Sequence, residues 1–163
     1  MKVWTLLTVS LLCVQCGGPQ LQNSHYSDGQ VSFDIGKLPA DWKQLDIEDG
    51  NDLAWQSARS GAVIQLNASC DPGLDIPLPA LRNHLLIGFT ERSFQHEQTI
   101  MLVKREALKS ELTAKLDGQV RALVLVVLKK DGCVYDFALI GRPSEQFEQS
   151  HRDFQTFLSG FQV

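Results

Sequence analysis

Two Asp-Gly pairs constrain the fold of this chain more than any other feature of its sequence. Asp117-Gly118 and Asp131-Gly132 each separate two runs rich in strand-forming residues. An Asp-Gly pair in this position is a strong signal for a tight β-hairpin, because the turn needs residues that accept positive φ. The pairs therefore predict an antiparallel meander over residues 96–141, with strands near 99–103, 107–116, 120–128 and 134–140.

The strand between the two turns carries a second prediction. Residues 122–128 are all apolar and do not alternate with polar residues, which is typical of a strand that is covered on both faces. Two amphipathic helices are available to cover it, one that starts near Leu78 and ends near Gly88, and one that starts at Pro143-Ser144. Their apolar stripes are Leu78, Leu81, Leu85 and Phe89 in the first helix and Phe147, Phe154, Leu158 and Phe161 in the second.

The first half of the chain adds shorter strands. Alternation predicts strands at 31–35 and 62–66, and a hairpin from 45–47 to 53–55 around a turn at 48–51. Together the elements predict an α+β fold, with a largely antiparallel β-sheet flanked by helices. A chain of 163 residues that is 44% hydrophobic can bury one core. We expect a single globular α+β domain over residues 31–163.

The N-terminus is typical of an export signal. Lys2 precedes a twelve-residue apolar run at 3–14, which is too short to span a bilayer but fits a secretory signal. A buried N-terminal strand or helix is the alternative, and the polar stretch that follows argues against it. We expect residues 1–15 to be a signal peptide and residues 16–30, which are poor in apolar residues, to form a tether.

Cys16, just after this run, resembles the acylated cysteine of bacterial lipoproteins. That family prefers Leu at −3 and Gly or Ala at −1, where this chain has Cys13 and Gln15. The resemblance implies lipidation of Cys16 and contact with the membrane through an N-terminal acyl anchor. Because Gly17 rather than Asp follows, it also implies the periplasmic face of the outer membrane. A secreted or soluble periplasmic protein is the alternative.

The balance of charged residues bears on which macromolecules the protein can bind. The chain has 15 Lys+Arg against 19 Asp+Glu, a formal net charge of −4 and a sequence pI near 5.5. This balance argues against nucleic acid as a partner, because its phosphates attract basic surfaces.

The order of the elements resembles the Mog1/PsbP-like fold. The residues that carry the resemblance are Leu38-Pro39-x-x-Trp42, the Asp-Gly-punctuated meander, Val134-Tyr135-Asp136-Phe137 and the closing Phe157-Leu158-x-x-Phe161. The likeness is greatest to small secreted or lipid-anchored bacterial members, many of which have no assigned function. It implies an α/β/α sandwich with a binding or accessory role, and it transfers no catalytic residue. Plant members have a metal-linked role, but no matching ligand set stands out in this sequence.

Two cysteines remain for the folded domain. Cys70 and Cys133 both lie at predicted strand ends, and an exported protein meets an oxidising compartment. A disulfide between them would contribute roughly 4 kcal/mol by restricting the unfolded chain. Two separate buried thiols are the alternative.

No pattern of residues indicates catalysis or metal binding. The chain has no Gly-x-Ser-x-Gly elbow and no phosphate-binding loop, and its four histidines lack the spacing of a zinc site. We therefore expect that the protein is not an enzyme and that it binds no cofactor and no metal. An uncharacterised hydrolase is the weakest of the functional alternatives.

Two binding functions remain. The first is an interaction or accessory module that meets an envelope protein through an apolar patch on a sheet edge or loop. The second is a binder or carrier of an apolar ligand such as a lipid, in a groove lined by Trp42, Trp55, Leu85 and Tyr135. For these aromatic residues, packing in the core is the ordinary alternative.

Overall fold

The computed structural model describes residues 20–47 and 53–163. The predicted signal peptide, Cys16 and the turn at 48–51 lie outside the described residues. Among the residues described, no helix is long and apolar enough to cross a membrane.

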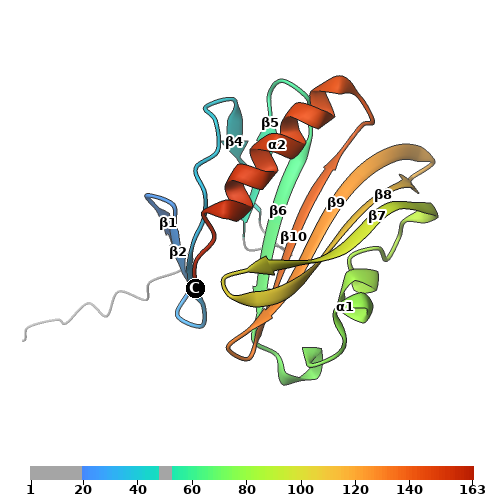
Figure 1. Ribbon diagram of the computed structural model, residues 1–163. Coiled ribbons are helices and arrows are strands. Elements are labelled where there is room, and N and C mark those ends of the chain that lie inside the picture. Colours follow the sequence, from blue (N-terminus) through green and yellow to red (C-terminus); the bar gives the residue numbers. More distant parts are fainter. Residues whose placement is uncertain (1–19, 48–52) are drawn as a thin grey trace, which may run out of the picture.

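A seven-stranded antiparallel sheet forms the centre of the molecule, with strand order β4-β5-β6-β10-β9-β8-β7 (Figure 1). The strands are β4 (Trp42–Gln44), β5 (Leu53–Ser57), β6 (Val63–Ser69), β7 (Thr90–Leu102), β8 (Arg105–Leu116), β9 (Gln119–Lys130) and β10 (Cys133–Gly141). A hairpin with β5 is confirmed, but its first strand is β4 at Trp42–Gln44 rather than the predicted 45–47, with Trp42 opposite Ser57 and Gln44 opposite Trp55. The α+β fold class is likewise confirmed.

The predicted meander is confirmed as β7 to β10. Both Asp-Gly pairs make two-residue turns with positive φ, 51° and 74° at Asp117-Gly118 and 53° and 80° at Asp131-Gly132. A third turn of this kind, at Val103-Lys104 with φ of 44° and 62°, joins β7 to β8. All three are tight enough to fix the register of the strands that they connect.

β7 is much longer than the sequence predicted. The expected strand began near Thr99, whereas β7 begins at Thr90. Its first nine residues are exposed and mostly polar, so they show no alternation that could mark them as a strand. They become a strand because β8 pairs with them, across two irregularities, between Thr90 and Ser93 and between Phe94 and His96.

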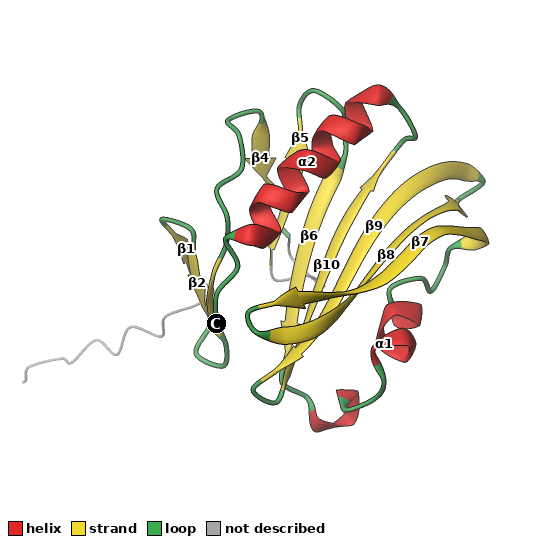
Figure 2. Cartoon of the chain, viewed as in Figure 1, coloured by secondary structure: helices red, strands yellow, loops and turns green. Residues whose placement is uncertain are grey.

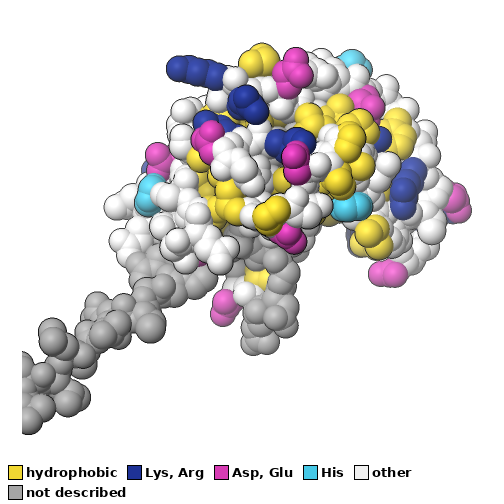
Figure 3. All heavy atoms as spheres, turned by 90° about the horizontal axis from the view of Figure 1, so that it is seen from below, with side chains coloured by type: hydrophobic (Ala, Val, Ile, Leu, Met, Phe, Trp, Pro, Cys, Tyr) yellow, Lys and Arg dark blue, Asp and Glu magenta, His cyan; other side chains and the backbone are white. Residues whose placement is uncertain are grey.

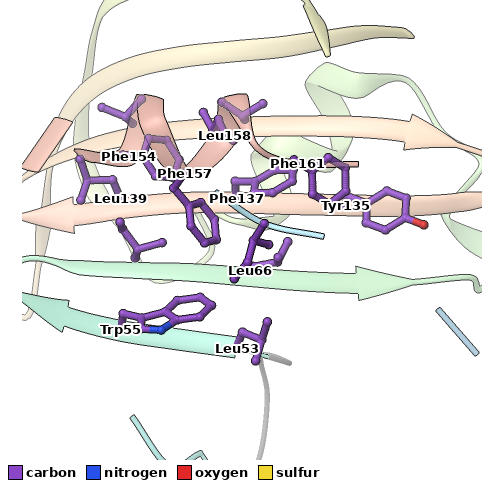
Figure 4. Close-up of a cluster of buried hydrophobic side chains, with 14 of the residues drawn as sticks. Leu53, Trp55, Leu66, Tyr135, Phe137, Leu139, Phe154, Phe157, Leu158 and Phe161 are labelled. Atoms are coloured by element: carbon purple, nitrogen blue, oxygen red, sulfur yellow. The ribbon is translucent and has the colours of Figure 1, made fainter. Parts of the chain in front are cut away.

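Helix α2 (Glu145–Ser159) covers one face of the sheet, as Figure 2 shows. Ser144 caps it, because its hydroxyl accepts a hydrogen bond from the Phe147 backbone N–H at 3.2 Å. The apolar stripe of α2 packs in a cluster of buried side chains, which Figure 4 shows. The residues labelled there include Trp55, Leu66, Tyr135, Phe137, Phe154, Phe157 and Phe161. This cluster is the main core.

Helix α1 (Leu78–His84) packs on the opposite face. It ends at His84, four residues earlier than predicted, and the chain passes through a turn to Gly88, which has a φ of 88°. Its Leu81 contacts Val127 and Val134, while Val126 and Leu128 point into the main core. The apolar strand is therefore covered on both faces, as expected. The short 3₁₀ helix η1 (Pro72–Leu74) precedes α1.

Residues expected to form the end of the tether instead belong to the fold. β1 (Gln20–Gln22), β2 (His25–Ser27) and β3 (Ser32–Asp34) form a second, three-stranded sheet. Tyr26 on β2 is 2% exposed and stacks on Phe33 at 4.8 Å between ring centroids. The expectation of a tether over 16–30 is thus corrected from residue 20 onward. Apolar content was low there, but the one aromatic residue is buried.

The small sheet meets the end of α2 at a close backbone crossing. Gly36 N–H donates to the carbonyl of Phe157 at 2.9 Å, and Asp34 pairs with Gln162. A Cβ atom on Gly160 would overlap the backbone of Gly36, and one on Gly36 would overlap the backbone of Thr156. Glycine at both positions is therefore what allows the two segments to touch.

Candidate interaction surface

The four residues predicted to line a ligand groove do not share a cavity. Trp42, Trp55 and Tyr135 lie on the α2 face and are 6%, 7% and 2% exposed, whereas Leu85 packs on the α1 face. Trp55 packs against Phe157, and Tyr135 packs against Phe33 and Phe161. The groove prediction is corrected, because these aromatic side chains fill the core.

Trp42 has a structural role that its polar atom explains. Its indole N–H donates to Asp153 on α2 at 2.9 Å. Arg59 bridges Asp153 and Asp41, at 3.2 and 2.8 Å, and its hydrogen bond is the main cause of the lowered pKa of the Asp41 carboxyl. These contacts connect α2 to the β4–β5 hairpin. They also provide hydrogen-bond partners for the Asp153 carboxylate, which would otherwise be costly to bury.

The predicted disulfide between Cys70 and Cys133 is present. Ser69 at the end of β6 pairs with Val134 of β10, so the two cysteines continue the same ladder by one position. The bond joins two neighbouring central strands at the end of the sheet where η1 and the β9–β10 turn lie.

A cluster of charged groups lies between β8 and α2. Lys109 contacts Glu111 at 2.7 Å and His151 at 3.3 Å. Burial acts to raise the pKa of Glu111, but the hydrogen bond and charge of Lys109, together with the charges of His151 and His96, outweigh burial and lower the pKa. Burial, with Lys109 adding to it, lowers the pKa of His151. The groups satisfy one another, so the cluster resembles a structural ion pair more than a site that waits for substrate.

Metal binding finds no support in the described ranges. Within residues 20–47 and 53–163, no group of three or more His, Cys, Asp or Glu side chains could hold a metal ion.

The most exposed regular element is β7. It ends the sheet, and in the described part of the chain no strand pairs with the edge of β7 that faces away from β8. Met101 is 68% exposed and Phe94 45%. On the face of β7 that α1 covers, Arg82 forms an ion pair with Glu97. The Cζ atom of Arg82 lies 4.4 Å from the centre of the Phe94 ring. Ser110 also donates to Glu97, at 2.9 Å.

Two open hollows meet at the tip of the β7–β8 hairpin. One, of about 540 Å³, lies between η1, the β9–β10 turn and the disulfide. The other, of about 450 Å³, lies between the start of α1 and the hairpin tip, and Arg105 and Lys129 line both. Its lining residues are Leu78, Met101, Lys104, Arg105, Glu106 and Lys129.

The charges around these hollows are unevenly satisfied. Lys129 pairs with Asp75 at 2.8 Å, which lowers the pKa of that carboxyl, and Lys130 pairs with Asp131 at 2.7 Å. None of the ion pairs found among the described residues involves Lys104 or Arg105. In the view from below, hydrophobic side chains reach the surface among side chains of both charges (Figure 3). We call the outer edge of β7 together with Lys104, Arg105 and the smaller hollow the hairpin-tip surface.

The sequence predicted an interaction surface on a sheet edge or a loop, without naming the residues that form it. Met101 fell within the expected strand at 99–103, yet nothing local indicated that this strand would be last in the sheet. Lys104 and Arg105 were not predicted as site residues. The signal that could have found them is a basic pair next to an exposed apolar residue at a predicted hairpin.

The comparisons with known proteins show the fold. No family model and no curated protein matches the sequence. Among solved structures, the chain is similar to the cyanobacterial PsbP protein CyanoP from Synechocystis, with a TM-score of 0.61 and 17% identity over 95% of this chain and 98% of that one. It is also similar to LpqN of Mycobacterium tuberculosis, described as involved in cell envelope biogenesis, with a TM-score of 0.55 and 13% identity over 80% and 83% of the two chains. The domain is therefore PsbP-like in fold.

Proposed function

We propose that this PsbP-like protein is a non-catalytic accessory module of the cell envelope that binds a partner protein. The observation that carries the proposal is the open edge of β7, which leaves a row of backbone donors and acceptors without a strand partner in the described part of the chain. Native sheets usually cover or shorten such an edge. A long one that stays exposed beside apolar side chains is a common docking surface.

The proposed setting is the envelope. LpqN, which has the same fold, is described as involved in cell envelope biogenesis, and the N-terminal sequence favours export. We include in the proposal that Cys16 is acylated and holds the protein on the periplasmic face of the outer membrane. An anchored protein would present its folded domain to envelope partners without a membrane-spanning helix.

The arrangement of polar groups favours binding over catalysis. The buried charged side chains near α2 pair with one another, as in the contacts of Asp153 with Trp42 and Arg59 and of Lys109 with Glu111. An active site needs groups that converge on a space where a substrate can sit. The open hollows at the hairpin tip suit a surface contact better than enclosure of a small molecule.

A photo-crosslinking experiment in cells of the source organism tests the proposal. A crosslinking amino acid at Met101 is expected to give a discrete adduct with one partner protein. The same amino acid at Lys43, which is exposed on β4 at the opposite edge of the sheet, serves as the matched control. Equal adduct patterns at the two positions, or none at Met101, would contradict a docking role for β7.

A further inference from the structure

We infer that the partner supplies an extended segment with acidic side chains, which adds as a strand to the Glu97–Leu102 half of β7 and reaches the Lys104–Arg105 tip. This inference rests on the proposed function and specifies how the partner is recognised. It depends on three observations: the direction of the backbone groups in β7, the uneven protection of its edge, and the charge at its tip.

The turn at Val103-Lys104 determines which backbone groups face outward. In an antiparallel pair joined by a two-residue turn, the residues that flank the turn bond to each other, and the bonding then alternates along the strand. Leu102 opposes Arg105, so Leu102, Ile100 and Gln98 direct their N–H and C=O groups to β8. Met101, Thr99 and Glu97 direct theirs to the open edge. These three residues can bond an added strand without any change in β8.

Protection of the edge differs between the two halves of β7. The first half, Thr90 to His96, carries both register irregularities and the charged residues Glu91 and Arg92. Bulges and charges of this kind normally prevent strands from adding to an edge. The residues at 98–102 contain no charge, no proline and no irregularity. Only this half is open, and it is long enough for a strand of five or six residues.

The hairpin tip determines the charge of the added segment. Side chains of Glu97, Thr99 and Met101 lie on the α1 face, where Arg82 reaches Glu97. A side chain of an added strand on this face, beside Met101, would lie at the rim of the smaller hollow. The rim presents apolar surface from Leu78 and Met101 and the cations Lys104 and Arg105 against Glu106. Lys129 also lies there, but its charge is paired with Asp75 at 2.8 Å. A partner segment with an apolar residue next to an acidic one would complement the rim of the hollow in both polarity and charge.

A second copy of this chain fits the same edge less well. The carboxylates that its own β7 would bring are already used, because Glu91 pairs with Lys115 at 2.8 Å and Glu97 pairs with Arg82. A β7–β7 pair longer than Glu97–Leu102 would also run into the irregularities of the first half. We therefore assign the edge to a different protein and treat self-association as an outcome of the test.

Selection from a displayed library of random ten-residue peptides on the immobilised full chain tests this inference directly. Enriched peptides are expected to combine β-branched or aromatic residues with Asp or Glu, and their binding is expected to weaken with added salt. The selected peptides then serve as defined probes for the variants below. No enrichment over an unrelated protein, or enrichment without acidic residues, would overturn the inference.

Thr99→Pro separates backbone pairing from other binding modes. Proline removes the outward N–H of Thr99 but no hydrogen bond to β8, and edge strands tolerate it there. Selected peptides are expected to bind this variant at least tenfold more weakly, whereas Thr99→Val, which keeps the N–H, should bind them as before. A thermal melt of each variant checks that it is folded. Unchanged affinity for Thr99→Pro would overturn the strand-addition inference.

Charge reversal tests the tip. Lys104→Glu with Arg105→Glu is expected to weaken binding at least fivefold and to reduce its salt dependence, whereas Lys43→Glu on β4 should have no effect.

If the Met101 crosslink forms in cells yet Thr99→Pro does not weaken it, the proposed function stands and the strand addition fails. If ultracentrifugation finds a dimer that Thr99→Pro dissociates, the occupant is a second copy and the inference is wrong.

Discussion

Asp136 is the residue whose surroundings most clearly conflict with its charge. It lies on β10 between Asn67 of β6 and Val127 of β9, and its Oδ1 atom is buried without a hydrogen-bond partner among the described residues. Burial raises the pKa of its carboxyl to about 7. The native state therefore holds this proton more tightly than the unfolded chain does, where the pKa is 3.8.

Asp136→Asn should change how stability depends on pH. Because the pKa of Asp136 is higher in the folded chain than in the unfolded chain, protonation of its carboxyl favours folding. This contribution to stability is complete below pH 3.8 and is lost as the pH rises through about 7. We expect the variant to be more stable than the natural chain at pH 8, by at most about 4 kcal/mol, and to lose this advantage below pH 4. Urea unfolding at several pH values measures the difference. A constant difference from pH 4 to pH 8 would contradict the raised pKa.

At the scale of elements, the crossing of β3 and α2 depends on two glycines. Gly160 has a φ of −90°, which any residue can adopt, so its need for glycine comes from the contact with Gly36 alone. The same contact brings the end of α2 against the chain that follows the small sheet. This is a close approach of two backbones that no side chain can relieve.

Gly160→Ala is expected to lower the free energy of unfolding by roughly 1–3 kcal/mol, the usual cost of forcing extra volume into a packed site. Without the overlap, the exchange of glycine for alanine would stabilise the chain slightly. Gly73→Ala is the control, because the nearest atom to its Cβ would be a carboxyl oxygen of the Asp71 side chain at 3.2 Å rather than a backbone atom. Thermal unfolding of both variants decides the matter. Equal melting temperatures would show that the two segments can separate at no cost.

For the whole molecule, the disulfide has the widest effect. Cys70 and Cys133 are 63 residues apart, and the segment between them includes α1, β7, β8 and β9. Replacing both by serine is expected to lower the free energy of unfolding by roughly 4 kcal/mol, because the unfolded chain regains this loop. Guanidinium unfolding should give the same midpoint for the double variant and for the natural chain under reducing agent. An unchanged midpoint after reduction would mean that the bond adds no stability.

The same scale shows what the sequence could and could not predict. The meander was predictable because Asp117-Gly118 and Asp131-Gly132 encode their turns locally. The disulfide followed from the few cysteines available and their positions at strand ends. β1 and β2 were missed because their pairing depends on β3 and on burial of Tyr26 by the main core. The candidate surface was missed for a similar reason, since only the order of strands makes β7 the last one.

The position of α2 in the chain has a consequence for the order of folding. The helix follows all seven strands of the large sheet, and its Phe147, Phe154, Phe157 and Leu158 cover the main core. A sheet that pairs before α2 docks therefore leaves its largest apolar face bare. Until α2 docks, that face is exposed apolar surface of the kind that favours aggregation.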